Sequence, residues 1–269
     1  MVHWQLNVEN EKFPLAKIFT VTISLLLLTA VLGAFSGIAF AQSSLCDNGE
    51  LKPSPSSSTL PVILVHGYNE GSGIWIPWEL ALEASGIQYC SVTFHPDDFC
   101  GRASHDATEL SKIVQNVKDM TQQNQVNIVA HSKGGLDARL YLSRSGTGDV
   151  ANLIMIGTPN AGSPVADYTE AFNLNPFCPA VRDLTTYAPV DNAAENPNTR
   201  YYTIAGMCLP FLEYGGITLI PEFNDGLVSV SSVESQSYFH SLGHSPNCHA
   251  FLLGNYEYLL AYGVLSGKE

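Results

Sequence analysis

A serine at position 132 lies in a segment that predicts a nucleophile. Residues 127–135 read Asn-Ile-Val-Ala-His-Ser-Lys-Gly-Gly, so an apolar run precedes the serine and glycines follow it. A serine on a sharp strand-to-helix turn needs small neighbours, because larger side chains would clash where the strand passes into the helix. Ala130 and Gly134 meet this need, and His131 and Gly134 are expected to support the turn. The alternative is an ordinary turn with an incidental serine.

Attack by a serine hydroxyl on a carbonyl creates an oxyanion, which backbone N–H groups can stabilise. The N–H of Lys133 would lie at the start of a helix, where the helix dipole favours negative charge. A second donor is expected from a loop after an early strand. His66-Gly67-Tyr68 follows an apolar run and fits this requirement. We expect the N–H of Tyr68 to be the donor, Gly67 to permit close backbone approach, and His66 to be a buried orienting residue.

Enzymes with this turn carry an acid and then a histidine base after the serine in chain order. Asp225, within the turn-forming sequence Asn-Asp-Gly, is the acid that we expect, with Asp191 and Glu222 as reserves. A solvated turn aspartate is the alternative interpretation of Asp225. His249 is the base that we expect, because an apolar run follows it that could anchor its loop, and His244 is the second choice.

The elements that must position these residues follow an alternating pattern. After residue 60, short apolar runs rich in β-branched residues alternate with helix-length stretches, which is typical of a parallel sheet with helical crossovers. We expect strands at 60–65, 88–94, 126–130, 151–156, 201–205 and 235–239, and helices at 106–121, 136–142 and 250–265. Between 163 and 200 turn formers replace periodic signals, which indicates either a functional loop or lid, or a solvated excursion.

The N-terminal part predicts export. Lys12 and Lys17 precede an uncharged stretch that ends in Ala-Phe-Ala at position 41, so residues 1–41 are typical of a secretory signal peptide. An uncleaved membrane anchor at 18–41 is the alternative. Residues 42–59 are rich in proline and serine and predict a linker, followed by one folded domain at 60–269. We therefore expect a secreted or extracytoplasmic protein.

The cysteines fit this location, because disulfides persist outside the cytoplasm. We expect the sequence-adjacent pairs Cys90 with Cys100 and Cys178 with Cys208, although the sequence leaves other pairings open. A cysteine nucleophile is disfavoured because an exported thiol is usually oxidised. All six cysteines follow position 41: Cys46, Cys90, Cys100, Cys178, Cys208 and Cys248.

The overall charge excludes some partners. With 12 basic and 25 acidic residues the formal net charge is −13, so the surface repels phosphate backbones. Nucleic acid is therefore not expected as a partner, and charge does not predict attraction to anionic membranes. The eight histidines show no spacing typical of a metal site, so neither a metal nor a cofactor is expected.

Taken together, these motifs resemble those of the bacterial triacylglycerol lipases and related lipase-like α/β-hydrolases, from about residue 61 to the C-terminus. Residues 157–163, Gly-Thr-Pro-Asn-Ala-Gly-Ser, resemble the Gly-Thr-Pro-His-x-Gly-Ser segment of those lipases. The resemblance implies an α/β-hydrolase fold, with a mostly parallel central sheet, helices on both faces and a short lid-like insert after Ser163. It also implies a small-molecule or lipid ester with an acyl chain as substrate, peripheral contact with a lipid surface, and Asp225 and His249 as acid and base.

The chain also departs from that family. Asn160 replaces the usual histidine, and Phe251 stands where several of these lipases have an aspartate that binds calcium, so calcium is not expected. The modest insert makes small, soluble esters as plausible as lipids. The same residues could cleave thioesters, amides, polyesters or lipid anchors. An inactive exported binding domain is the alternative of a different class, but it would be expected to lose Ser132 or its base.

Overall fold

The computed structural model describes residues 59–94, 100–145 and 147–268. The predicted signal peptide, and the predicted linker apart from its last residue, lie outside these residues. Within the described part of the chain, no helix is long and apolar enough to cross a membrane.

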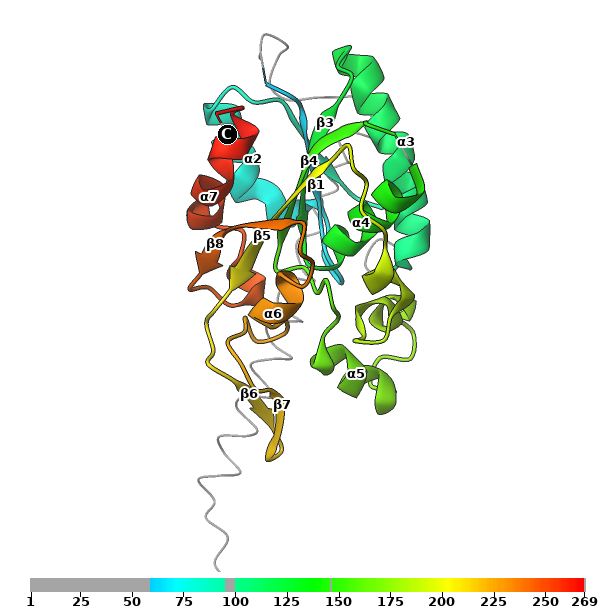
Figure 1. The fold of residues 1–269 in the computed structure, drawn as a ribbon, viewed down its shortest axis with the longest axis vertical. Coiled ribbons are helices and arrows are strands. Elements are labelled where there is room, and N and C mark those ends of the chain that lie inside the picture. The colour runs from blue at the N-terminus through cyan, green and yellow to red at the C-terminus, as the bar shows by residue number, and fades with distance from the viewer. Residues whose placement is uncertain (1–58, 95–99, 146, 269) are drawn as a thin grey trace, which may run out of the picture. The chain divides into compact units, whose positions relative to one another are not determined.

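A six-stranded parallel sheet lies at the centre of the described domain (Figure 1). Its strands are ordered β2-β1-β3-β4-β5-β8, and every neighbouring pair runs parallel. The strands are β1 (Val62–Val65), β2 (Tyr89–Val92), β3 (Val126–His131), β4 (Val150–Ile156), β5 (Arg200–Gly206) and β8 (Phe239–Ser245). The predicted fold class is confirmed.

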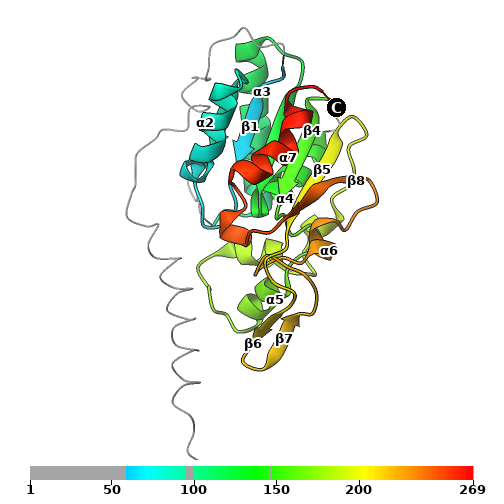
Figure 2. The ribbon, with the colours of Figure 1, turned by 90° about the vertical axis from the view of Figure 1, so that its left-hand side faces the viewer.

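Helices cover both faces of this sheet, as the two views show (Figures 1 and 2). On one face α3 (Ala103–Thr121) and α4 (Lys133–Ser145) pack on alternate strand residues such as Ile63 and Val65. On the other face α2 (Ile76–Ala84) and α7 (Asn255–Leu265) pack on the intervening residues Val62 and Leu64. Two cores therefore fix the register of the strands, because a shift by one residue would exchange the two faces.

The sequence missed the edge strand and part of the last helix. The strand predicted at 235–239 is wrong: β8 begins at Phe239 and ends at Ser245, with half-exposed polar residues that give no apolar run. The helix predicted at 250–265 is wrong in its first part, where a 3-10 turn, η4 (His249–Phe251), precedes α7. A further 3-10 turn, η1 (Ser72–Trp75), and α2 were not predicted.

The segment from 163 to 200 contains more regular structure than its sequence indicates. Ser163 accepts a hydrogen bond from the N–H of Val165 and so caps α5 (Pro164–Ala171). Two 3-10 turns follow, η2 (Pro179–Leu184) and η3 (Pro189–Asn192). The hairpin of β6 (Leu212–Tyr214) and β7 (Ile217–Ile220), and short α6 (Val230–Val233), lie with α5 beyond the same end of the sheet (Figures 1 and 2).

Both predicted disulfides are wrong. Cys100 is bonded to Cys178, and Cys208 to Cys248, across 78 and 40 residues of sequence. Cys90 is disulfide-bonded as well. The fold brings distant loops together beyond the sheet, so nearness in the sequence does not decide the pairing.

Candidate active site

Ser132 occupies the turn between β3 and α4. Its φ is 51°, in the left-handed region that non-glycine residues rarely adopt. Two hydrogen bonds hold this conformation: the N–H of Ser132 donates to the carbonyl of Ile156 at 2.9 Å, and its carbonyl accepts from the N–H of Gly135 at 3.1 Å. The sheet and the helix start together therefore hold the strained turn.

The two glycines after this turn lie where a side chain has no room. A Cβ at Gly134 would lie 2.4 Å from the carbonyl oxygen of His66, and one at Gly135 would lie 2.1 Å from Oγ1 of Thr158. Both obstacles are firm, since one is backbone and the other a fully buried side chain. This close approach packs the start of α4 against the loop after β1.

A chain of hydrogen bonds joins the three residues expected to react. Nε2 of His249 lies 2.9 Å from Oγ of Ser132, and Nδ1 of His249 lies 2.7 Å from Oδ2 of Asp225. The other oxygen of Asp225 accepts the N–H groups of Leu227 and Val228 at 2.9 and 2.7 Å. The buried carboxylate is thus held from one side by its own loop and faces the imidazole on the other.

The surroundings of His249 favour its charged form. Burial alone would lower the pKa of its imidazole, but the charge and hydrogen bond of Asp225, with a further contribution from Glu70, raise that pKa above its ordinary value. The site therefore stabilises the imidazolium that would form when His249 takes a proton from Ser132.

The loop after β1 lies directly against Ser132. A Cβ at Gly67 would lie 2.7 Å from the Cβ of Ser132. Among the described residues, no hydrogen bond engages the N–H of Tyr68 or that of Lys133. Lys133 begins α4, where the first N–H groups have no acceptor inside the helix. Two donors are therefore available on the two segments that flank Ser132.

Comparison with known proteins identifies the fold. Residues 61–176 match the family described as alpha/beta hydrolase fold. The mature lipase BlEst2 of Bacillus licheniformis superposes with a TM-score of 0.67 at 22% sequence identity, over 81% of this chain and 98% of that chain. The chain has the α/β-hydrolase fold.

Two bacterial relatives extend the comparison to sequence. The triacylglycerol lipases of Pseudarthrobacter phenanthrenivorans and Burkholderia plantarii are each 29% identical to this chain over 124 residues, or 43% of its length. The matched segments span 38% and 34% of those two lipases. The chain is thus a distant homologue of bacterial triacylglycerol lipases.

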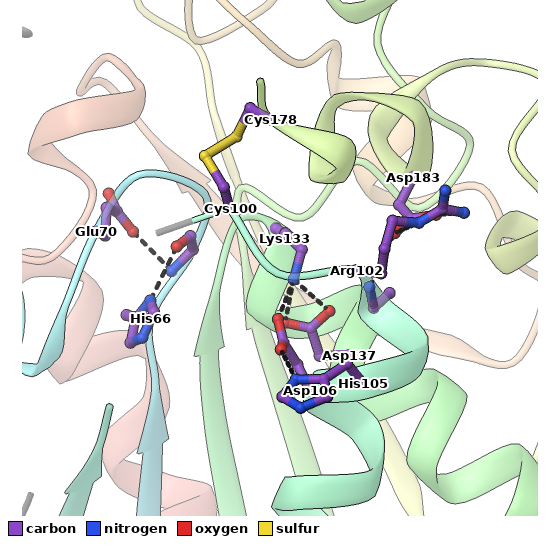
Figure 3. A network of polar contacts seen from close by, with 12 residues as sticks. His66, Glu70, Cys100, Arg102, His105, Asp106, Lys133, Asp137, Cys178 and Asp183 are labelled. Atoms are coloured by element: carbon purple, nitrogen blue, oxygen red, sulfur yellow. Dashed lines mark hydrogen bonds and ion pairs between the residues drawn. A yellow bond between two sulfur atoms is a disulfide. The ribbon is translucent and has the colours of Figure 1, made fainter. Parts of the chain in front are cut away.

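Within this α/β-hydrolase fold, the side chain of Lys133 forms a buried ionic cluster (Figure 3). Its ammonium donates to Asp106 on α3 and, at 2.9 Å, to both carboxylate oxygens of Asp137 on α4. Burial would lower the pKa of Lys133, but the two carboxylates raise it. Burial raises the pKa of Asp137 to about 7 despite Lys133. The cluster fastens the start of α4 to α3.

The remaining predicted residues lie outside the hydrogen-bonded chain. His66 is buried against Phe94, with its Nδ1 2.9 Å from the carbonyl oxygen of Gly67, and burial lowers its pKa. His244 pairs at the surface with Glu234 at 3.0 Å. The exposed carboxylate of Glu222 accepts from Ser231, and the side chain of Asp191 lies outside what the structure describes.

Two departures from the lipase pattern have local explanations. Asn160 is fully buried, where it accepts from Arg139 at 3.1 Å and donates to the carbonyl of Val233 at 2.8 Å, so it ties α4 to α6. Phe251 is 66% exposed and lies two residues after His249. The residues that the structure describes contain no group of three or more histidine, cysteine, aspartate or glutamate side chains able to hold a metal ion.

Sequence reasoning missed Glu70. It ends the loop that carries Tyr68, and its carboxylate accepts the N–H of Gly67 at 2.7 Å and lies 2.8 Å from Nδ1 of His131. A lone glutamate in a loop carries no local signal, because its partner His131 is 61 residues away.

Proposed function

We propose that this protein is an exported serine hydrolase that cleaves carboxylic esters through an acyl-enzyme on Ser132. The observation that carries the proposal is the hydrogen-bonded chain from Ser132 through His249 to Asp225. Oγ of Ser132 lies 2.9 Å from Nε2 of His249, and Nδ1 of His249 lies 2.7 Å from Oδ2 of Asp225. The N–H groups of Tyr68 and Lys133 lie on the segments that flank Ser132. The distant homology to triacylglycerol lipases supports the same reaction class.

In the proposed reaction His249 accepts the proton of Ser132 at Nε2 while the serine oxygen attacks the ester carbonyl carbon. Asp225 accepts the hydrogen of Nδ1, which keeps Nε2 free as a base, and it stabilises the imidazolium. The N–H groups of Tyr68 and Lys133 donate to the oxyanion of the tetrahedral intermediate.

The intermediate then collapses with loss of the alcohol, which takes the proton from His249. The acyl group stays on the serine oxygen until water attacks its carbonyl carbon. His249 accepts a proton from that water and returns it to Ser132 as the acid leaves. Each cycle thus consumes one water and restores the starting protonation states.

Exposed apolar side chains within two sequence positions of the proposed acid and base support an ester with an apolar acyl part. Phe223 and Leu227 flank Asp225 with 54% and 40% of their surfaces exposed, and Phe251 follows His249 with 66% exposed. Export is supported by the disulfides, which persist in oxidising compartments, and by the N-terminal pattern of the sequence.

The test is labelling with an active-site fluorophosphonate, followed by peptide mapping and turnover of p-nitrophenyl esters with short and long acyl chains. We expect the label on Ser132, and none after Ser132→Ala. Ser111→Ala is the matched control, because Ser111 is half-buried on α3 and its hydroxyl donates to the carbonyl of Thr108 in the same helix. A folded wild-type protein that takes no label and cleaves no ester would refute the proposal.

A further inference from the structure

Glu70 connects two separate parts of the proposed site. One oxygen of its carboxylate accepts the N–H of Gly67, on the loop that carries the Tyr68 donor, and lies against Nδ1 of His131, the residue before Ser132. Figure 3 shows Glu70 on the same turn as His66, with its carboxylate directed back at the backbone of that turn. The turn after β1 and the end of β3 are thus joined through one side chain.

His131 extends this connection to the catalytic base. Its Nε2 lies 3.2 Å from the main-chain carbonyl oxygen of His249, and the two imidazole rings lie 4.9 Å apart between centroids. His131 is 1% exposed, so water cannot replace either of its partners. The ring therefore lies between the carboxylate of Glu70 and the main chain of His249.

The partners of His131 determine its protonation. A carboxylate and a carbonyl oxygen can only accept hydrogen bonds, and a neutral imidazole has only one N–H to donate. Both bonds form together only if both ring nitrogens carry hydrogen. The ionised state of Glu70 agrees with this: burial would raise the pKa of its carboxyl, but the neighbouring histidines and the N–H of Gly67 lower it.

We propose that Glu70 and His131 are a charged positioning pair, in which an imidazolium at His131 and a carboxylate at Glu70 hold the oxyanion loop and the main chain of His249 in register with Ser132. The inference rests on the proposed function, since it assigns these two residues to the same reaction. Neither residue would touch the substrate; both act through Gly67, the serine turn and His249.

The two members of the proposed pair would present opposite charges to His249. The charged groups that face His249 are Asp225 from the loop before α6, Glu70 from the turn after β1, and His131 from β3. In the proposed pair the charge of His131 would oppose the contribution of Glu70 to the pKa of His249. We therefore expect the pair to act by positioning the oxyanion loop and the main chain of His249. The observable that tests this role is the protonation of His131.

The first experiment needs no variant. Long-range proton–nitrogen NMR correlations of the wild-type protein at pH 7.5 report whether one or both nitrogens of each imidazole carry hydrogen, and His131→Gln assigns the signal. We expect both nitrogens of His131 to be protonated in the wild type and only one in Glu70→Gln. A neutral His131 in the wild type would overturn the proposal.

The second experiment measures the effect on turnover. Glu70→Gln and His131→Gln should each lower kcat by about tenfold or more with little change in KM, because misplacement of catalytic groups affects the transition state more than binding. The double variant should be no slower than the slower single variant, because the two residues act as a unit. Additive losses, or a Glu70→Gln enzyme within twofold of wild type, would overturn the proposal.

A second glutamate–histidine pair provides the control. Glu234 and His244 lie 3.0 Å apart on the surface, so Glu234→Gln should change neither kcat nor the signal of His131. Failure of the proposed function would give a different result: fluorophosphonate would leave Ser132 unlabelled in a folded wild-type protein. That result does not depend on the protonation of His131.

Discussion

Replacement of Gly67 by alanine should remove most of the activity without unfolding the protein. The added Cβ would lie 2.7 Å from the Cβ of Ser132 and 3.1 Å from the carbonyl oxygen of His131. Non-bonded carbons approach to about 3.5–4.0 Å, so the loop must retreat by about 1 Å. The Tyr68 donor moves with it, and loss of one oxyanion donor lowers kcat by about a hundredfold to a thousandfold.

The assay compares Gly67→Ala with Gly73→Ala, a glycine of η1 at which an added Cβ would meet nothing within 4 Å. Steady-state hydrolysis of a soluble p-nitrophenyl ester and the rate of fluorophosphonate labelling report the site, and circular dichroism reports the fold. We expect Gly73→Ala to match the wild type in both assays. A folded Gly67→Ala protein that retains turnover within threefold of wild type would show that this loop does not supply the donor.

Further expectations concern the base, the ionic cluster and a disulfide. His249→Ala should lower kcat by about a thousandfold or more, whereas His244→Ala should stay within about twofold; the reverse ranking in ester hydrolysis would move the base. Burial raises the pKa of Asp137 to about 7, so its carboxyl binds its proton more tightly in the folded than in the unfolded state. The stability that this proton contributes is fully present below about pH 4 and is lost as the pH rises to about 7. Asp137→Asn does not titrate, so its free energy of unfolding relative to wild type should increase from pH 5 to about pH 7, by at most about 1.4 kcal/mol per pH unit; parallel curves in denaturant unfolding at each pH would contradict the shift. Removal of the bond between Cys208 and Cys248 by paired serine substitutions should cost about 4 kcal/mol of unfolding free energy, since it closes a 40-residue span, and an unchanged denaturant midpoint would contradict this.

Local patterns were sufficient to predict the centre of this fold. Val62–Val65 is a buried apolar run and Val126–His131 is a buried, mostly apolar one, and burial on both faces makes such strands recognisable in a sequence. The turn at Ser132 was predictable for a related reason, because its small neighbours are required by contacts within a few residues of the serine and by the strand beside it.

The edge of the sheet and the charged partners were not predictable in this way. Phe239–Ser245 lies at the sheet edge, where one side of the strand is solvated and no apolar run is needed. Asp106 and Glu70 acquire their roles from residues 27 and 61 positions away, so no local pattern marks them. The disulfide partners follow the same rule, since Cys100 meets Cys178 only after the loops beyond the sheet have assembled.

The position of the Cys208–Cys248 bond determines which of the proposed catalytic residues depend on oxidation. Cys248 directly precedes His249. Leu209, which follows Cys208, exchanges backbone hydrogen bonds of 3.0 and 2.9 Å with Asn224, and Asn224 directly precedes Asp225. One covalent bond therefore joins the two loops that carry the proposed base and the proposed acid, while the strand before Ser132 lies in the central sheet and does not depend on this bond. For the proposed exported hydrolase, a newly made chain in a reducing compartment would have Ser132 in place before the proposed base and acid were secured, so oxidation on export would complete the proposed triad.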